Sequence, residues 1–171
     1  MKRIAIATAV TLALAACAGT GGEQSPTASV KLEPRSGSQV RGSLTLTQVA
    51  PDRVRIAGEV AGHSPGPKGF HIHDKGDCSA PDAMSAGGHF NPGGSKHGGL
   101  TGARHAGDIG NIVFDASGKA TVNVVAEGIT LTQGAANNVV GRAVVVHAAA
   151  DDLKTDPTGN SGGRVACGVI Q

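Results

Sequence analysis

The chain has 171 residues, a length that suits one domain with short extensions. It carries 15 Lys and Arg residues against 13 Asp and Glu residues, and only 2% of its residues are aromatic, with no Trp and no Tyr. This composition excludes an aromatic core, and the 27 glycines favour short strands and turns over long helices.

Residues 1–16 are predicted to be an export signal. The basic start Met-Lys-Arg precedes an apolar run that is too short to span a bilayer as a mature helix. The run ends in Leu-Ala-Ala before Cys17, which resembles a bacterial lipobox, where the peptide is cut before a cysteine that receives lipid. The alternative is an ordinary signal peptide in which Cys17 is incidental.

Removal of this signal changes how the charge and the cysteines are interpreted. Lys2 and Arg3 leave with it, so 13 basic residues remain against 13 acidic ones, and nothing in the charge indicates a nucleic-acid partner. With Cys17 lipidated, Cys78 and Cys167 remain and allow one disulfide in an oxidising compartment. Residues 17–28 are predicted to form a tether, and residues 29–171 to form the domain.

Short segments with alternating apolar and polar residues follow the tether. They span residues 29–33, 39–48, 53–60, 69–73, 111–115, 119–127, 142–148 and 164–170. Eight such segments predict an all-β fold, an eight-stranded sandwich or barrel. Residues 74–110 and 148–163 lack this alternation, and loops of that length inside a domain are usually functional.

The histidines give the strongest chemical signal. In residues 69–73, His71 and His73 share one face of a strand while Phe70 and Ile72 share the other, so the histidines are expected outside the barrel beneath a crossing loop. The first loop contains His-x7-His-x7-His-x2-Asp, formed by His89, His97, His105 and Asp108. Imidazole suits zinc and copper, and the Asp108 carboxylate can complete a tetrahedral zinc site. There is no His-Glu-x-x-His motif of a zinc protease.

Four stretches resemble the signature regions of bacterial copper/zinc superoxide dismutases of the exported lipoprotein type. They are GFHIHDKGDCSAPDAMSAGGHFNP, KHGGLTGARHAGDIGN, GRAVVVHAAADDL and GGRVACGVI. The resemblance runs from about residue 28 to residue 171. It implies an eight-stranded Greek-key β-barrel with two long functional loops, a fold that is a standard member of the β-sandwich class.

The resemblance also implies a role for each site residue. One copper per chain would be held by His71, His73, His89 and His147, and one zinc by His89, His97, His105 and Asp108, so His89 would bridge the metals and serve in catalysis. Asp151 would tie His71 to His97, the Cys78–Cys167 disulfide would pin the loop, and Arg164 would guide the superoxide anion. His63 is left as a surface histidine.

Some positions depart from the family pattern. Lys68 stands where many relatives carry a histidine, and no steering residue of the second loop can be carried over, which leaves Lys75 and Lys154 as candidates. The expected activity is conversion of superoxide to dioxygen and hydrogen peroxide by cycling copper between Cu(II) and Cu(I), with zinc structural.

Two rival functions are weighed against this activity. A non-enzymatic copper- and zinc-binding lipoprotein would need the same ligands but not Arg164, and a degenerate surface domain would have lost ligands.

The expected setting follows from the N-terminus and the composition. The protein is expected on the periplasmic side of a bacterial envelope, anchored to the outer membrane only through the lipid on Cys17, with Ala18 in place of Asp favouring that membrane. No nucleic-acid partner is expected. The absence of Tyr and Trp favours a monomer, with a weak homodimer as the alternative.

Overall fold

A computed structural model describes residues 25–171; the predicted signal, Cys17 and most of the predicted tether lie outside the described residues. The strands are β1 (Thr27–Pro34), β2 (Arg41–Ala50), β3 (Arg53–Ala61), β4 (Gly66–His73), β5 (Asp108–Phe114), β6 (Lys119–Glu127), β7 (Ala143–His147) and β8 (Arg164–Val169). One short 3₁₀ turn, η1 (Met84–Ala86), interrupts the first long loop. Among the described residues, no helix is long and apolar enough to cross a membrane.

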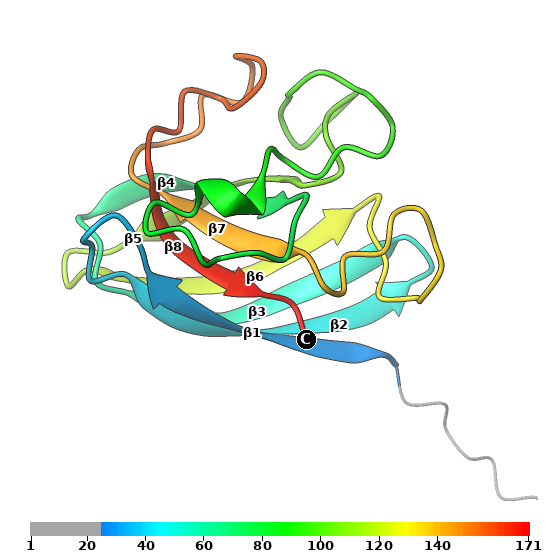
Figure 1. Cartoon of the computed structure of the whole chain (residues 1–171), viewed down its shortest axis with the longest axis horizontal. Coiled ribbons are helices and arrows are strands. Elements are labelled where there is room, and N and C mark those ends of the chain that lie inside the picture. The colour runs from blue at the N-terminus through cyan, green and yellow to red at the C-terminus, as the bar shows by residue number, and fades with distance from the viewer. Residues whose placement is uncertain (1–24) are drawn as a thin grey trace, which may run out of the picture.

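The strands form one antiparallel sheet that rolls into a nearly closed barrel. Their order is β5-β4-β7-β8-β1-β2-β3-β6, in which β1 lies between β8 and β2, and β7 lies between β4 and β8. No strand pairing joins β5 to β6 in the described residues, so the barrel is open along that seam. The predicted eight-stranded barrel with two long loops is confirmed (Figure 1).

The alternation read from the sequence sets which side chains fill the barrel. Leu44 and Leu46 of β2, Ile56 of β3 and Phe70 and Ile72 of β4 are all buried in one hydrophobic core. Strand β5 begins at Asp108, earlier than residue 111 predicted from the sequence, so the first loop ends at residue 107.

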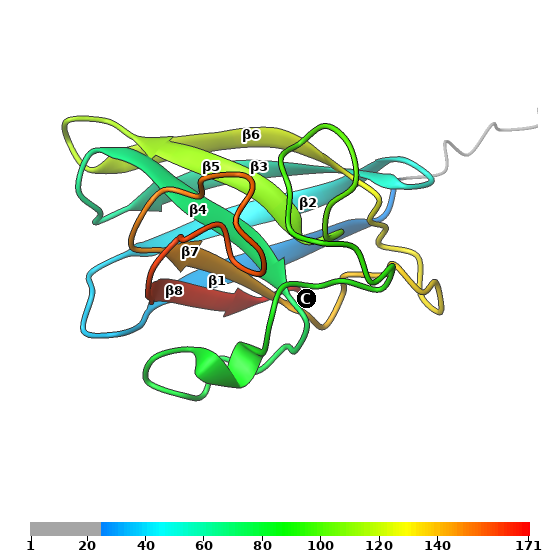
Figure 2. The same cartoon turned by 90° about the horizontal axis from the view of Figure 1, so that it is seen from above.

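Strands β4 and β7 are covered on both faces. All five residues of β7 and the last five of β4 are buried, although only one face of each strand meets the barrel core. Figures 1 and 2 show the reason: the loop of residues 74–107 and the loop of residues 148–163 both pass over the outer side of these strands. The outer faces of β4 and β7 therefore meet the loops in a buried layer outside the barrel.

Candidate metal centre

Strand alternation presents three histidines to this layer. Phe70 and Ile72 point into the barrel core, so His71 and His73 point outward beneath the loops, and both are fully buried. His147 joins them from the end of β7, next to β4 in the sheet. The prediction that these histidines lie outside the barrel under a loop is confirmed.

The first group of histidines gathers where the loops cross β4 and β7. It contains His71, His73, His89 and His147, whose potential ligand atoms lie within 4.8 Å of one another. Nε2 of His73 lies 3.3 Å from Nε2 of His147. His89 is brought in by an isolated bridge between its backbone and that of His73. These are the four residues that the resemblance implied for copper.

The second group lies in the first long loop and at the start of β5. It contains His89, His97, His105 and Asp108, again with potential ligand atoms within 4.8 Å of one another. Oδ1 of Asp108 lies 2.8 Å from Nδ1 of His89, 3.0 Å from Nδ1 of His97 and 3.2 Å from Nδ1 of His105. Three imidazoles and one carboxylate around one point are a donor set that zinc accepts.

His89 belongs to both groups. Its Nδ1 faces Asp108, while its Nε2 is buried without a hydrogen-bond partner and its ring lies 4.1 Å from the ring of His71. The two nitrogens of one ring therefore face the two different groups. This arrangement fits one imidazole shared between two metal ions.

Burial keeps three of these imidazoles neutral. It lowers the pKa of His73 to about 2, that of His147 to about 3 and that of His89 to about 4. Burial alone would raise the pKa of Asp108, but the contact with His89 and the other nearby rings lower it to about 2. At neutral pH these three rings therefore offer neutral nitrogens and Asp108 offers a carboxylate, the forms that bind metal ions.

Buried histidine nitrogens without hydrogen-bond partners indicate that each group could hold a cation. Nδ1 of His71, Nε2 of His89 and Nδ1 of His97 are buried atoms that make no hydrogen bond in the described residues. Leaving a buried polar nitrogen unpaired costs about 1–3 kcal/mol. A cation in each group would pair all three, and a group of four imidazoles suits copper while the group with Asp108 suits zinc.

Asp151 connects the groups from the second long loop. Its Oδ2 lies 2.8 Å from Nε2 of His71, and its Oδ1 lies 2.9 Å from Nε2 of His97. The backbone N–H of Leu153 donates to the same Oδ1 at 2.7 Å. Gly159 packs so closely that a Cβ there would overlap this carboxylate, and its φ of +61° also favours glycine.

Arg164 lies opposite His147 in the pairing of β7 with β8. Its guanidinium donates to the carbonyls of Ala83 at 2.7 Å and Gly87 at 2.6 Å, at the two ends of η1. The carbonyl of Gly87 also lies 3.0 Å from Nδ1 of His73. One carbonyl thus links a fixed positive charge to a histidine of the first group.

A disulfide between Cys78 and Cys167 holds this loop to β8, and the disulfide expected from the resemblance is present. Nε of Arg35 donates to the carbonyl of Cys78 at 2.8 Å. Beneath the bond lies a small apolar cluster separate from the barrel core. The loop that carries the acceptors of Arg164 is therefore anchored both covalently and by packing.

The candidate steering lysines and His63 lie outside the two groups. The side chain of Lys75 runs along Gly87, its nearest atom 3.5 Å from where a Cβ of that residue would lie, whereas Lys154 is exposed in the second loop. The interpretation of His63 as a surface residue is only partly right. Its Nε2 is buried, and its ring lies 5.1 Å from that of Phe114.

Sequence reasoning missed Arg142, which begins the segment that leads into β7. Its Nη1 donates to the carbonyl of Asp74 at 2.6 Å and to its carboxylate at 2.8 Å. Its guanidinium carbon lies 3.6 Å from the centre of the Phe90 ring. Asp74 and Phe90 directly follow His73 and His89, so one cation fixes two positions beside ligand candidates. No periodicity or motif in the sequence identifies this contact.

Asn111 of β5 was also missed. Its side chain donates to the carbonyl of Asp151 at 2.9 Å and accepts from the N–H of Asp151 at 2.8 Å. This pair of bonds fixes the backbone of Asp151 on the first turn of the second loop. Asn111 ends one of the resembling stretches, and that position was its only signal.

The chain is similar to a known protein family and to a solved structure. A family model described as copper/zinc superoxide dismutase matches residues 40–170, most of the chain. A solved structure titled "Crystal Structure Analysis of the clock protein EA4" is similar with a TM-score of 0.77 and 41% sequence identity. The similarity covers 88% of this chain and 96% of that one.

Proposed function

This chain belongs to the copper/zinc superoxide dismutase family, and from that membership we propose that it converts superoxide to dioxygen and hydrogen peroxide. The ligands of copper would be His71, His73, His89 and His147, and those of zinc His89, His97, His105 and Asp108. When bound, copper supplies the electron transfer by alternating between Cu(II) and Cu(I), because zinc has no accessible second oxidation state.

The observation that carries this proposal is the position of Arg164. Its guanidinium shares the Gly87 carbonyl with Nδ1 of His73, so a permanent positive charge lies beside the group proposed for copper. A guanidinium can attract a small anion and hydrogen-bond to it. The predicted mature chain has no net charge, so attraction must come from charges at the site, and superoxide dismutases are a standard example of such steering.

His89 has the second role in the proposed reaction. Its Nε2 makes no hydrogen bond to the described residues, while its Nδ1 is held towards Asp108. Nε2 can therefore take up a proton and give it to the departing peroxide without the ring losing its orientation. Asp151 supports this arrangement, because it fixes the rings of His71 and His97 on either side.

A copper- and zinc-binding protein without catalysis is the second candidate. One observation favours it: the similar solved structure is named for a clock protein, not for an enzyme. A carrier would use the same ligands but has no need of Arg164 held beside them. Metal analysis combined with a superoxide-decay assay tests the two. One copper and one zinc per chain with rapid decay supports the enzyme, whereas both metals without decay support the carrier.

We further propose that the protein is an exported bacterial lipoprotein, anchored through Cys17 on the periplasmic side of the outer membrane. The apolar run that ends in Leu-Ala-Ala-Cys supports this proposal. Cys17→Ser should prevent lipid attachment, normal lipoprotein processing and anchoring through lipid, while superoxide decay persists. A Cys17→Ser variant that still carries lipid would contradict the assignment of Cys17. Gel filtration of the processed protein would test the proposed monomer against a weak homodimer.

A further inference from the structure

A histidine that binds a metal through one ring nitrogen normally donates its other N–H to a carboxylate or carbonyl, which fixes the ring and its tautomer. Most histidines of the two groups have such a partner. The partners are the Asp151 carboxylate for His71 and His97, the Gly87 carbonyl for His73 and the Gly162 carbonyl for His147. His89 directs its two nitrogens to the two groups. Only His105 is left without a partner inside hydrogen-bond distance for its outer nitrogen.

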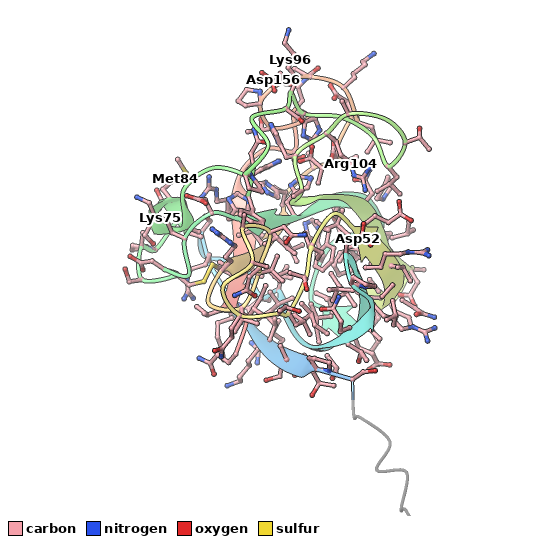
Figure 3. All side chains as sticks on the ribbon, turned by 90° about the vertical axis from the view of Figure 1, so that its right-hand side faces the viewer. Asp52, Lys75, Met84, Lys96, Arg104 and Asp156 are labelled. Carbon is pink, nitrogen blue, oxygen red and sulfur yellow. A yellow bond between two sulfur atoms is a disulfide. The ribbon has the colours of Figure 1, made fainter. Side chains whose placement is uncertain are left out.

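Asp156 faces that nitrogen. Its Oδ1 lies 3.8 Å from Nε2 of His105, while Nδ1 of the same ring lies 3.2 Å from Asp108. The position of the carboxylate is fixed, because the same Oδ1 accepts from the backbone N–H of His97 at 2.7 Å. Figure 3 shows Asp156 beside Lys96 at the outer end of the loops.

We propose that Asp156 is a positioning residue of the zinc group, an inference that rests on the proposed assignment of zinc to His89, His97, His105 and Asp108. Zinc on Nδ1 of His105 requires the proton on Nε2, and the Asp156 carboxylate is the negative charge that favours this tautomer. At 3.8 Å the interaction is electrostatic or passes through one water, because direct hydrogen bonds are shorter. The second loop therefore orients two histidines of the zinc group, with Asp151 facing His97 and Asp156 facing His105.

A simpler role is that Asp156 only ties the second loop to the backbone of His97. The two roles need different properties of the side chain: the tie needs only an oxygen that accepts a hydrogen bond, whereas the positioning of His105 needs a negative charge. An amide oxygen can accept from the N–H of His97 but carries no negative charge for Nε2 of His105. Asp156→Asn therefore keeps the tie and removes the charge, whereas Asp156→Ala removes both.

The test is zinc affinity, measured on copper-free protein by competition with a chelator at low and high salt. Loss of an outer partner typically costs about 10- to 100-fold in metal affinity, and the half-exposed Asp156 should lie near the lower limit. Asp156→Asn should thus weaken zinc binding about tenfold at low salt. Because an exposed charge is screened, the deficit should shrink at high salt, which a purely structural role does not predict.

Asp52→Asn is the matched control, since Asp52 is exposed in the turn between β2 and β3, far from Asp156 in Figure 3. It should leave zinc affinity unchanged. Wild-type zinc affinity in Asp156→Asn, with loss only in Asp156→Ala, would overturn the charge role of Asp156 while leaving the zinc assignment standing. A wild-type protein that binds no zinc would instead overturn both that assignment and this inference.

Discussion

Nε2 of His71 lies 2.8 Å from Oδ2 of Asp151, a buried contact that joins a strand histidine of one metal group to the loop that supports the other. Since Oδ1 of the same carboxylate meets His97, a single side chain orients one ligand candidate in each group. The two groups are therefore mechanically coupled, although they share only His89 as a ligand candidate.

Asp151→Ala should weaken zinc binding by about 10- to 100-fold. The substitution leaves the outer nitrogens of His71 and His97 buried and unpaired, so both rings lose their orientation. Chelator competition on purified protein measures the effect. Unchanged zinc affinity would show that packing alone holds these rings.

Substitution of a ligand candidate that belongs to only one group should remove one metal and leave the other bound. His147→Ala should abolish superoxide decay while zinc stays bound, because His147 belongs only to the first group. His105→Ala should lose zinc and loosen the loop, yet keep copper and part of the activity. Elemental analysis of each variant provides the measurement, and equal loss of both metals in both variants would refute the division.

Reduction of the Cys78–Cys167 bond should destabilise the protein. The bond closes a segment with a sequence separation of 89, for which the loss of chain entropy in the unfolded state contributes about 4 kcal/mol. Urea unfolding of Cys78→Ser against the wild type, both free of metal, measures this contribution. A difference below about 1 kcal/mol would mean that packing under the bond already holds the loop.

Arg164→Ala should lower the rate of superoxide decay severalfold and weaken its dependence on salt, with copper and zinc content unchanged. Arg164→Glu should be slower still, because it reverses the charge beside the site. Arg55→Ala is a suitable control, since Arg55 is exposed on β3 and contacts Asn123 across the outer face of the sheet. Wild-type rates in both Arg164 variants at low salt would remove its guiding role.

The barrel could be predicted from the sequence because each strand is marked by a local alternation of apolar and polar residues. Alternation along a strand places Leu44 and Leu46 on one face, independently of how distant parts of the chain fold. Both side chains are buried in the structure. The histidine spacing could be read for the same reason, because residues in one strand or one loop keep their order. The resemblance then supplied the distant members, His147 and Asp151, that spacing alone does not associate.

The residues that sequence reasoning missed depend on how loops fold back. Arg142 reaches Asp74 because β4 pairs with β7, with His73 opposite Ala143, and it reaches Phe90 because the first loop folds back beside these strands. No period in the sequence reports either contact. Asp156 is similar, because its neighbours His97 and His105 come from the other long loop. The partial burial of His63 beside Phe114 likewise depends on where the connection between β3 and β4 turns.

The bond between Cys78 and Cys167 also turns most of the site into a closed covalent ring. His89, His97, His105, Asp108, His147 and Asp151 all lie on the ring, whereas His71 and His73 precede it. A protease that cuts once in an exposed loop on the ring opens it without dividing the molecule. The nicked protein keeps every ligand candidate in one covalent unit, and it would separate into two fragments only after reduction.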